Sequence, residues 1–568
     1  MDAVIFLCWV YTLMNRLFVA QISSISLLYF EWLGLGLFYI IIRNLNSAKQ
    51  VFLLYTIMIS GFLQAVYGLQ QVYGYSDSLH HLFKITGGFF NPGPYSGFIL
   101  TAMPVTLCFL VFKWQNTYWH NSQENLKFDL LKKMGIHVKI GRLLFYWIPL
   151  CSFLLMLVVL PATQSRASWI GALGIILYIA NIRFGLWGKL KVLLKKRKNL
   201  AVIAGILIVA VFTSAFIALY QLKKEYADGR LLIWRVTIEM IAEKPFFGHG
   251  FEMFKGKYMN HQASYFLNKE DAVKATMLAD DNRYVFNDFL KTWVEKGVLG
   301  LVLVLTILGF AFHSKSQKGS SGQALFLLNA SKSSLFGIVV FAVFSYPSEI
   351  LPIKVNLIVF LSVLAANSPD IFRCNAFSHK RIRILKSIFV LALCLASFKV
   401  PSRGQTFNTV YAQWQTALST YSLGAHQSSV VHYESIYEEL KQEGEFLGHY
   451  GKALSVTGNH VLALEILKEA EKYMNNSLVQ IALGDTYKAL GRFHEAETAY
   501  LQAYHMVPVR FFPLFQLANL YYLMGDFDKA LNMAHTILKK EVKIPSSAIE
   551  EMKTLMKKMI DDINEDSK

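Results

Sequence analysis

The chain has 568 residues, of which 54% are hydrophobic and only 17% are charged. A soluble protein normally carries about 25% charged residues, so the composition excludes an ordinary soluble protein and indicates several membrane spans. The net charge of +18 would suit a nucleic-acid-binding protein, but the basic residues lie between apolar runs. We therefore expect no nucleic acid as a partner and predict a membrane-embedded protein.

About eleven apolar runs are long enough to cross a bilayer, which takes about 20 residues per helix. The first run is short, but the chain start lacks the basic segment and the cleavage site of a signal peptide, so we interpret it as a span. The predicted spans cover residues 3–20, 24–42, 51–72, 94–112, 143–161, 167–182, 200–220, 289–312, 324–346, 351–366 and 384–400.

Lysine and arginine residues gather in alternate connections between these runs. Five connections carry between two and seven basic residues each, whereas the short connections between them carry one each. Basic connections stay in the cytoplasm, so we predict a cytoplasmic N-terminus. The loop 220–288 and everything after residue 400 then lie on the opposite side of the membrane.

The long loop opens with a charged helix that ends at a glycine turn. In the stretch 229–251, GRLLIWRVTIEMIAEKPFFGHGF, Pro245 and the Gly-His-Gly sequence end the helix. Arg230, Trp234 and Ile238 recur at helical spacing. We predict that this helix lies along the membrane interface, with the tryptophan at the depth of the lipid headgroups.

Three motifs occur in a fixed order between residues 163 and 300. They are T-Q-S-R-A-S-W, then G-R-x-x-x-W followed by P-x-x-G-x-G, then F-N-D-F-L followed by E-x-G-x-x-G. Their order, their spacing and the large loop resemble the O-antigen ligase and polymerase superfamily. The resemblance implies an all-α membrane domain, 1–402, that transfers an oligosaccharide from an undecaprenyl diphosphate carrier without a metal or other cofactor.

The leaving group of that reaction is a diphosphate, for which planar arginine side chains are the best fixed cations. Arg166 lies in a short external connection, and Arg230 matches the arginine of the family's loop. Arg235 is close to Arg230 on the same helix. We predict that these three bind the diphosphate; alternatively, Arg166 anchors a span at the interface and Arg235 faces water.

The family's usual histidine is replaced by Phe286, so the general base must lie elsewhere. Asn287 and Asp288 remain beside it. His261, in the polar loop, is the first candidate base because its intrinsic pKa suits neutral conditions. Asp288 and His249 are further candidates, and either histidine is alternatively a surface residue. The predicted catalytic residues are therefore His261, Asp288, His249 and Asn287.

The tail, 403–568, consists of short amphipathic segments with an internal repeat. Residues 477–510 place Leu483, Gly484, Tyr487, Ala496 and Tyr500 at spacings that resemble the tetratricopeptide repeat, and the units before and after repeat the pattern. We predict a helical solenoid with about three units. It binds a partner protein on its concave surface or, alternatively, is a rigid cap on its own membrane domain.

Three functions remain open at this stage. The first is transfer of a lipid-linked oligosaccharide to lipid A core or to protein, at the outer face of the bacterial inner membrane, with the tail in the periplasm. The second is a polysaccharide polymerase. The third is a non-catalytic membrane scaffold that displays the repeats: the missing histidine favours it, whereas the retained Arg166, Arg230 and Asn287 argue against it.

Overall fold

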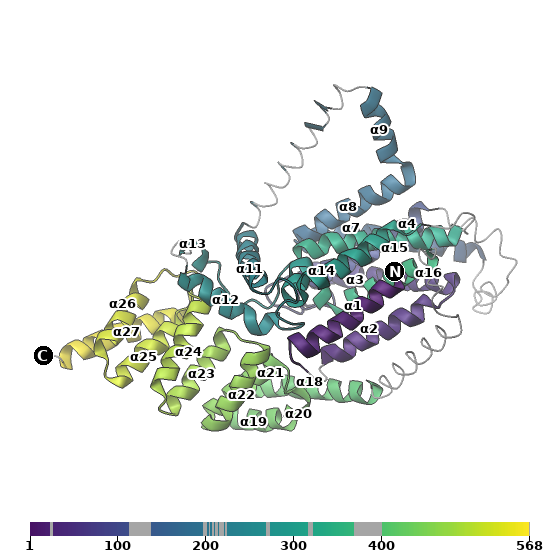
Figure 1. Cartoon of the computed structure of the whole chain (residues 1–568). Coiled ribbons are helices and arrows are strands. Elements are labelled where there is room, and N and C mark those ends of the chain that lie inside the picture. Colours follow the sequence, from purple (N-terminus) through teal and green to yellow (C-terminus); the bar gives the residue numbers. More distant parts are fainter. Residues whose placement is uncertain are drawn as a thin grey trace.

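The structure, a computed structural model of the chain, is helical throughout the residues that it describes. A bundle of long helices (purple to teal in Figure 1) lies beside a stack of short helix pairs formed by the C-terminal part (green to yellow). The described residues are 1–22, 27–112, 138–196, 224–268, 273–315, 322–368 and 400–566, with scattered positions between 202 and 221.

The helices of the bundle follow the predicted spans, which confirms the membrane fold. In the described part of the chain, six helices are long and apolar enough to cross a membrane, and Trp147–Ala162 and Leu351–Asn367 are shorter apolar helices. The bundle contains α1 (Asp2–Met14) with the π-helical turn η1 (Asn15–Val19), α2 (Leu27–Arg43), α3 (Ser47–Val72), α4 (Pro92–Val111), α7 (Val138–Ala162), α8 (Arg166–Phe184), α14 (Asp288–His313), α15 (Gly322–Phe344) and α16 (Leu351–Asn367).

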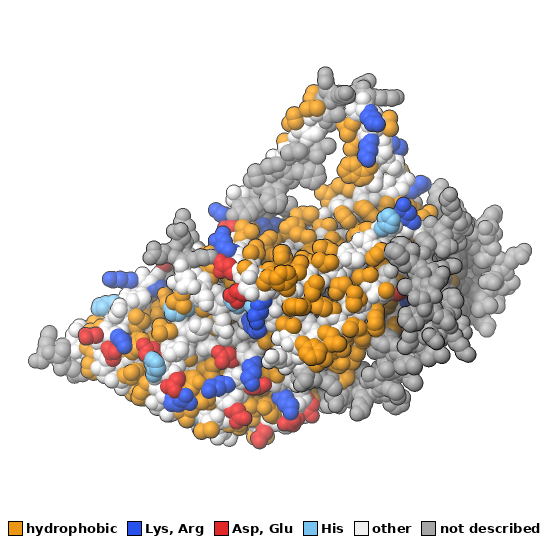
Figure 2. All heavy atoms as spheres, viewed as in Figure 1, with side chains coloured by type: hydrophobic (Ala, Val, Ile, Leu, Met, Phe, Trp, Pro, Cys, Tyr) orange, Lys and Arg blue, Asp and Glu red, His pale blue; other side chains and the backbone are white. Residues whose placement is uncertain are grey.

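The spans predicted at 200–220 and 384–400 lie largely outside the described residues. Helix α9 (Leu186–Lys196), which is rich in lysine, extends away from the bundle (Figure 1). Figure 2 shows apolar side chains as a broad orange band over the bundle, whereas acidic and basic side chains gather over the loop and the C-terminal helices. This distribution is the one expected for a bundle in lipid joined to helices in water.

Helix α4 lies at the centre of the bundle and is buried along most of its length. Small residues let its neighbours approach closely, as is typical of membrane helices. Gly171 of α8 faces Leu100, and Gly97 faces Phe341 of α15, with side-chain atoms 2.5–2.6 Å from where a Cβ would lie. Buried polar bonds cross this core from the Asn356 amide to the Thr101 hydroxyl and between the hydroxyls of Ser168 and Ser96, both at 2.7 Å.

The long loop folds into α11 (Lys224–Glu243), α12 (Phe254–Asn268) and the short α13 (Val273–Thr276). The position of α11 at the membrane interface stays a prediction, but Trp234 has a partner within the protein. The Trp234 indole donates to the Val285 carbonyl at 2.9 Å, and Ile233, Val236 and Met240 are buried against α12 and α14. The loop has a hydrophobic core of its own, so the helix packs on protein.

The glycine turn after α11 is locked into a break in α14. At Gly297 this helix has φ 67° and ψ −175°, so the carbonyls of the preceding turn lose their helical donors. The His249 amide donates to the Val294 carbonyl at 2.8 Å, and the Gly250 amide donates to the next carbonyl at 2.9 Å. A Cβ on Gly297 would lie 2.0 Å from a carbonyl oxygen of the turn, so only glycine fits there. The P-x-x-G-x-G turn and the E-x-G segment of α14 thus contact each other directly through their backbones.

The tail forms the predicted repeats. Leu483, Ala496 and Tyr500 are buried, and a Cβ on Gly484 would lie 2.4 Å from the Tyr500 ring, which confirms the close helix contact expected at that position. The long α18 (Val400–Ser422) and the short α19 (His426–Ser435) and α20 (Tyr437–Leu440) lead into three helix pairs. These are α21 (Gly444–Val456) with α22 (His460–Tyr473), α23 (Ser477–Ala489) with α24 (Phe493–Met506), and α25 (Phe512–Met524) with α26 (Phe527–Lys539); α27 (Ser547–Asp566) covers the last pair.

The repeats dock on the loop through the turns between successive pairs. The Gln262 amide of α12 donates to the Met506 carbonyl at 2.6 Å, and Asp281 accepts from the amide and the hydroxyl of Ser477 at 2.9 and 2.8 Å. Gly256 lies so close to α22 that a Cβ there would be 2.4 Å from a backbone oxygen. The array is therefore fixed to the membrane domain by specific polar and close-packed contacts.

Candidate active site

Two of the predicted arginines, Arg166 and Arg230, lie at the end of the bundle that carries the loop, close enough for the charge of one to act on the other. Arg166 is the first residue of α8. Arg230 of α11 reaches the C-terminal end of α15, where its guanidinium donates to the Phe344 carbonyl at 2.8 Å. Burial lowers the pKa of Arg230, and the nearby charge of Arg166 lowers it further. No ion pair of Arg230 with a carboxylate occurs among the described residues. Arg166 lies at the positive end of α8, whereas Arg230 binds the carbonyl end of α15, so the pair of cations is what favours an anion here.

Aromatic rings extend from this arginine pair. The Arg230 guanidinium lies 5.0 Å from the centroid of the Phe286 ring, a cation–π contact. Phe286 meets Tyr346 edge-on at 5.2 Å, and Tyr346 stacks on Tyr284 at 4.2 Å with an interplanar angle of 3°. Phe286, at the position of the family's histidine, thus contacts Arg230 and forms a continuous aromatic wall with Tyr346 and Tyr284.

That wall lines a cavity of about 430 Å³, within the range of about 300–1,000 Å³ that is usual for ligand sites. Four parts of the chain enclose it: α1 and α2, the loop, α14 with the connection that follows α15, and the start of the repeats. The repeats contribute residues 442–445 and 473–474. Arg283 of the loop forms a bidentate ion pair with Glu445 of α21, with hydrogen bonds of 2.7 and 2.8 Å. The tail is therefore one wall of the cavity.

Acidic and basic side chains lie next to one another in the lining of the cavity. Asp288 accepts from the amide and the hydroxyl of Ser348 at 2.8 and 2.7 Å. One turn further along α14, Lys291 forms a buried ion pair with Glu349, which Lys255 also approaches at 3.9 Å. Burial by itself would raise the pKa of Glu349, but Lys291 and Lys255 hold it at about 2. Glu349 therefore stays charged and serves to hold Lys291, whereas Asp288 presents a carboxylate in the cavity.

We expect Glu349→Gln to destabilise the protein by about 3 kcal/mol at neutral pH, because it leaves the buried Lys291 without its closest carboxylate. A carboxyl with a lowered pKa contributes stability above its unfolded pKa of 4.5, and this is lost as the pH falls towards about 2. The difference from wild type should therefore shrink across that window. Thermal unfolding in detergent at several pH values measures it. Glu438→Gln, in an exposed ion pair with Lys441, is the control, and equal losses in both variants would contradict the assignment.

Two predicted residues have structural partners instead. The Asn287 side chain accepts from the amides of Phe289 and Leu290, both at 3.0 Å, so it caps α14. Arg235 is exposed on the other side of α11 from Arg230 and donates to the Tyr265 hydroxyl at 3.0 Å. The structure thus brings neither side chain to the arginine pair.

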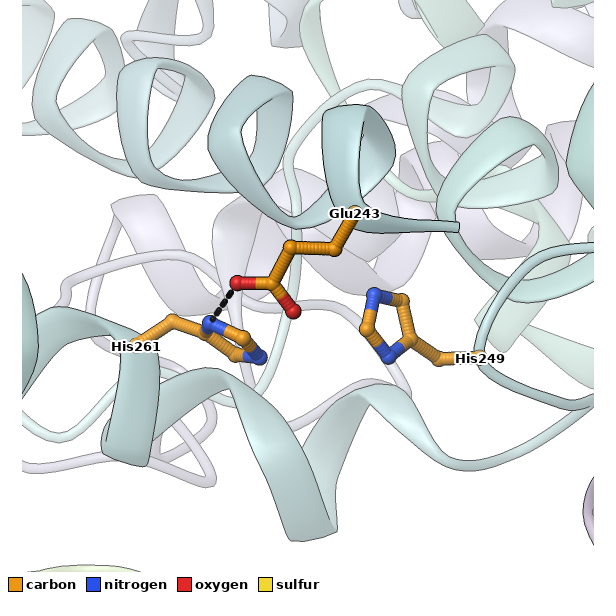
Figure 3. Close-up of side chains that lie close together, drawn as sticks. All are labelled: Glu243, His249 and His261. Carbon is orange, nitrogen blue, oxygen red and sulfur yellow. Dashed lines mark ion pairs between the residues drawn. The ribbon is translucent and has the colours of Figure 1, made fainter. Parts of the chain in front are cut away.

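The two histidines lie together beside Glu243 (Figure 3). His261 is 3.2 Å from Glu243, and its ring centroid is 5.5 Å from that of His249. Glu243 ends α11, whereas Arg230 lies near its start; 13 residues of helix separate them by about 20 Å. Burial lowers the pKa of both histidines. The structure does not bring either histidine to the arginine pair.

One cavity residue escaped the sequence reasoning. Glu252 directly follows the glycine turn with a positive φ of 71°, and it pairs with Arg16 at 2.5 Å. Burial raises the pKa of Glu252 to about 7, although Arg16 opposes the rise. Two features of the sequence could have indicated this ion pair: a lone arginine, Arg16, at the end of the first span, and a glutamate, Glu252, near the glycine turn. Opposite charges near a membrane tend to pair.

Comparison with known proteins agrees with this geometry. Residues 151–305, which include Arg166, Arg230, the glycine turn and the broken α14, match the O-antigen ligase family. Residues 151–305 thus carry an O-antigen ligase domain. Residues 479–506, which form α23 and α24, match the tetratricopeptide repeat, so this O-antigen ligase domain is followed by a tetratricopeptide tail.

A TPR repeat-containing protein of Methanocaldococcus jannaschii is 32% identical over 163 residues. The matched segment covers 28% of this chain and 28% of that protein. The chain therefore spans about a quarter of the length of that relative, and the similarity does not extend to whole-protein function.

Proposed function

We propose that the chain transfers an oligosaccharide from an undecaprenyl diphosphate carrier to a hydroxyl of lipid A core or of a protein. The observation that carries this proposal is the O-antigen ligase match over residues 151–305, within which Arg230 lies against Phe286 of the cavity wall and close enough to Arg166 to feel its charge. Paired guanidinium groups suit the two phosphates of the leaving group. They stabilise negative charge as it develops, so no metal ion is needed for that step.

The rest of the cavity suits the sugar and the acceptor. Sugar rings have apolar C–H faces that pack on aromatic side chains, and Tyr284, Phe286 and Tyr346 supply such a wall next to the arginines. Asp288, on the same cavity, is the base in this proposal and takes the proton of the attacking hydroxyl. Because the tail walls the cavity, the acceptor would pass between the repeats and the membrane domain.

In the proposed orientation the N-terminus is cytoplasmic, and the cavity and the repeats lie in the periplasm, at the outer face of the inner membrane. The excess of basic residues in alternate connections supports it. Reporter fusions at residue 480 check the orientation, and a cytoplasmic signal there would contradict it.

Deletion of the gene, with lipopolysaccharide, capsule and glycoproteins analysed together, tests the function. A ligase mutant should accumulate glycan that is not attached to lipid A core or protein. Shortened glycan chains would instead indicate a polysaccharide polymerase. Because Phe286 replaces the family's histidine, a non-catalytic scaffold is the second candidate. It would be supported if glycans are unchanged, or if a full-length Arg230→Ala chain restores them.

A further inference from the structure

Glu243, His249 and His261 form a cluster of metal-ligating side chains away from the proposed catalytic site (Figure 3). Glu243 ends α11, His249 lies in the glycine turn and His261 lies on α12. One ligand atom from each residue lies within 4.8 Å of the other two. Three elements that are separate along the loop thus bring two imidazoles and a carboxylate to one point.

The hydrogen bonding of His249 is the pattern of a metal ligand. Its side chain is buried, and its Nε2 lies 2.8 Å from the Met240 carbonyl. A carbonyl only accepts, so Nε2 carries the proton and Nδ1 keeps its lone pair. Metal-binding histidines almost always donate their other ring N–H to a carbonyl or carboxylate in this way, because the bond fixes the ring and the tautomer.

We propose that these three residues bind one divalent transition-metal ion of the zinc class, through Nδ1 of His249, a ring nitrogen of His261 and a carboxylate oxygen of Glu243. Imidazole nitrogens favour zinc and its neighbours over magnesium and calcium, which prefer oxygen ligands. Two histidines and a glutamate leave the fourth position of the tetrahedron to water.

The cluster needs only a small contraction to reach this geometry. With metal–ligand bonds of about 2.0–2.2 Å, tetrahedral ligand atoms lie about 3.3 Å apart, so the largest separation must shorten by about 1.5 Å. The Glu243 side chain is 55% exposed and that of His261 is 22% exposed, so both can move toward the buried His249. The glutamate is the adjustable ligand.

Two lysines oppose a cation here. Lys257 donates to the His249 carbonyl at 3.1 Å, and Lys257 and Lys244 both lie close enough for their charge to act on that imidazole. Glu243 and Glu239 act on His261 with the opposite sign. The lysines should weaken the binding without abolishing it, so removing Lys257 should tighten it.

The ion would hold the loop together and take no part in glycan transfer. It would join the end of α11 to the turn that fills the break in α14, and both to α12, on which the repeats dock. It would thereby fix the helix that carries Arg230 at its other end. This inference does not depend on the proposed function, because ion binding is measured without any glycan.

Metal binding by the purified full-length protein in detergent tests the site. After treatment with a chelator, wild type should take up one equivalent of Zn²⁺ in equilibrium dialysis, and Co²⁺ should give the absorption of a tetrahedral site. His261→Ala, at a partly exposed side chain, and Glu243→Gln, at an exposed one, should weaken Zn²⁺ binding by at least about 10–100-fold. Lys257→Met should strengthen it. Zn²⁺ should also raise the unfolding temperature of wild type.

His494→Ala is the matched control. This histidine is 89% exposed and lies 3.8 Å from Glu497, so it is a histidine–glutamate pair without a second histidine. It should bind Zn²⁺ like wild type. The proposal is overturned if wild type binds no Zn²⁺, if His261→Ala binds it as tightly as wild type, or if His494→Ala loses as much affinity as His261→Ala.

Discussion

Arg230→Ala is expected to lower glycan transfer by about 10²–10³-fold, the usual cost of removing one group that stabilises charge in a transition state. Its guanidinium is buried beside Arg166, with a backbone carbonyl and the Phe286 ring as partners. Arg166→Ala should have a similar effect, because two phosphates need both cations. Transfer of a lipid-linked glycan by membranes that contain equal amounts of each variant measures this.

Arg235→Ala is the control, because it removes an exposed arginine from the same helix. Arg230→Lys should restore little activity, since an ammonium group cannot reproduce the planar fork. Full transfer by both Arg230→Ala and Arg166→Ala would remove the diphosphate site. Equal losses in Arg230→Ala and Arg235→Ala would indicate damage to α11 instead.

The sequence predicted that Arg166 and Arg230 lie near each other, because the predicted topology puts both on the same side of the membrane, and the structure places them close enough for their charges to interact. It did not predict that the two histidines lie together. His261 also lies on that side, but its position depends on how α12 packs. Periodicity shows that α12 is a helix; it does not show that this helix packs between α11 and the repeats, with His261 at the end of α11 that carries Glu243.

The paired glycine motifs show a second limit of sequence reasoning. Gly248 and Gly250 marked the turn after the helix, and both have the positive φ that such positions require; Gly297, in the E-x-G-x-x-G motif, also has a positive φ. That the turn fills the break in α14 is a long-range contact between backbone groups. Backbone hydrogen bonds do not depend on the type of side chain, so the sequence indicates this contact only through the glycines that make room for it.

The role of the tail also depends on packing. The repeat pattern predicted helix pairs correctly, because small and large residues alternate where the helices touch. It left open whether the array binds a partner or caps the membrane domain. The bonds from Arg283 to Glu445 and from Gln262 to the Met506 carbonyl show that one edge of the array is a fixed contact with the loop. Protein partners of the array, which we still propose, must therefore use its remaining surfaces.

A base for the acceptor hydroxyl is the remaining requirement of the proposed reaction. Phe286 cannot take a proton, and the two histidines lie at the far end of α11. Asp288 is next but one to Phe286, at the start of α14 and on the cavity. Its oxygens accept from the backbone and the side chain of Ser348, which orients the carboxylate without supplying a cation.

Asp288→Asn should therefore lower transfer by about 10²–10⁴-fold, the usual contribution of a positioned base, while the protein keeps its fold because the amide has the same shape. His261→Ala should keep most of the activity, since His261 lies beside Glu243, which 13 residues of helix, about 20 Å, separate from Arg230. Rates of the two variants at saturating donor, compared with wild type, decide between them. Full activity of Asp288→Asn would mean that the arginines act by stabilising the leaving group without this base. A large loss in His261→Ala alone would instead return the base to the histidine cluster and require the loop to move during the reaction.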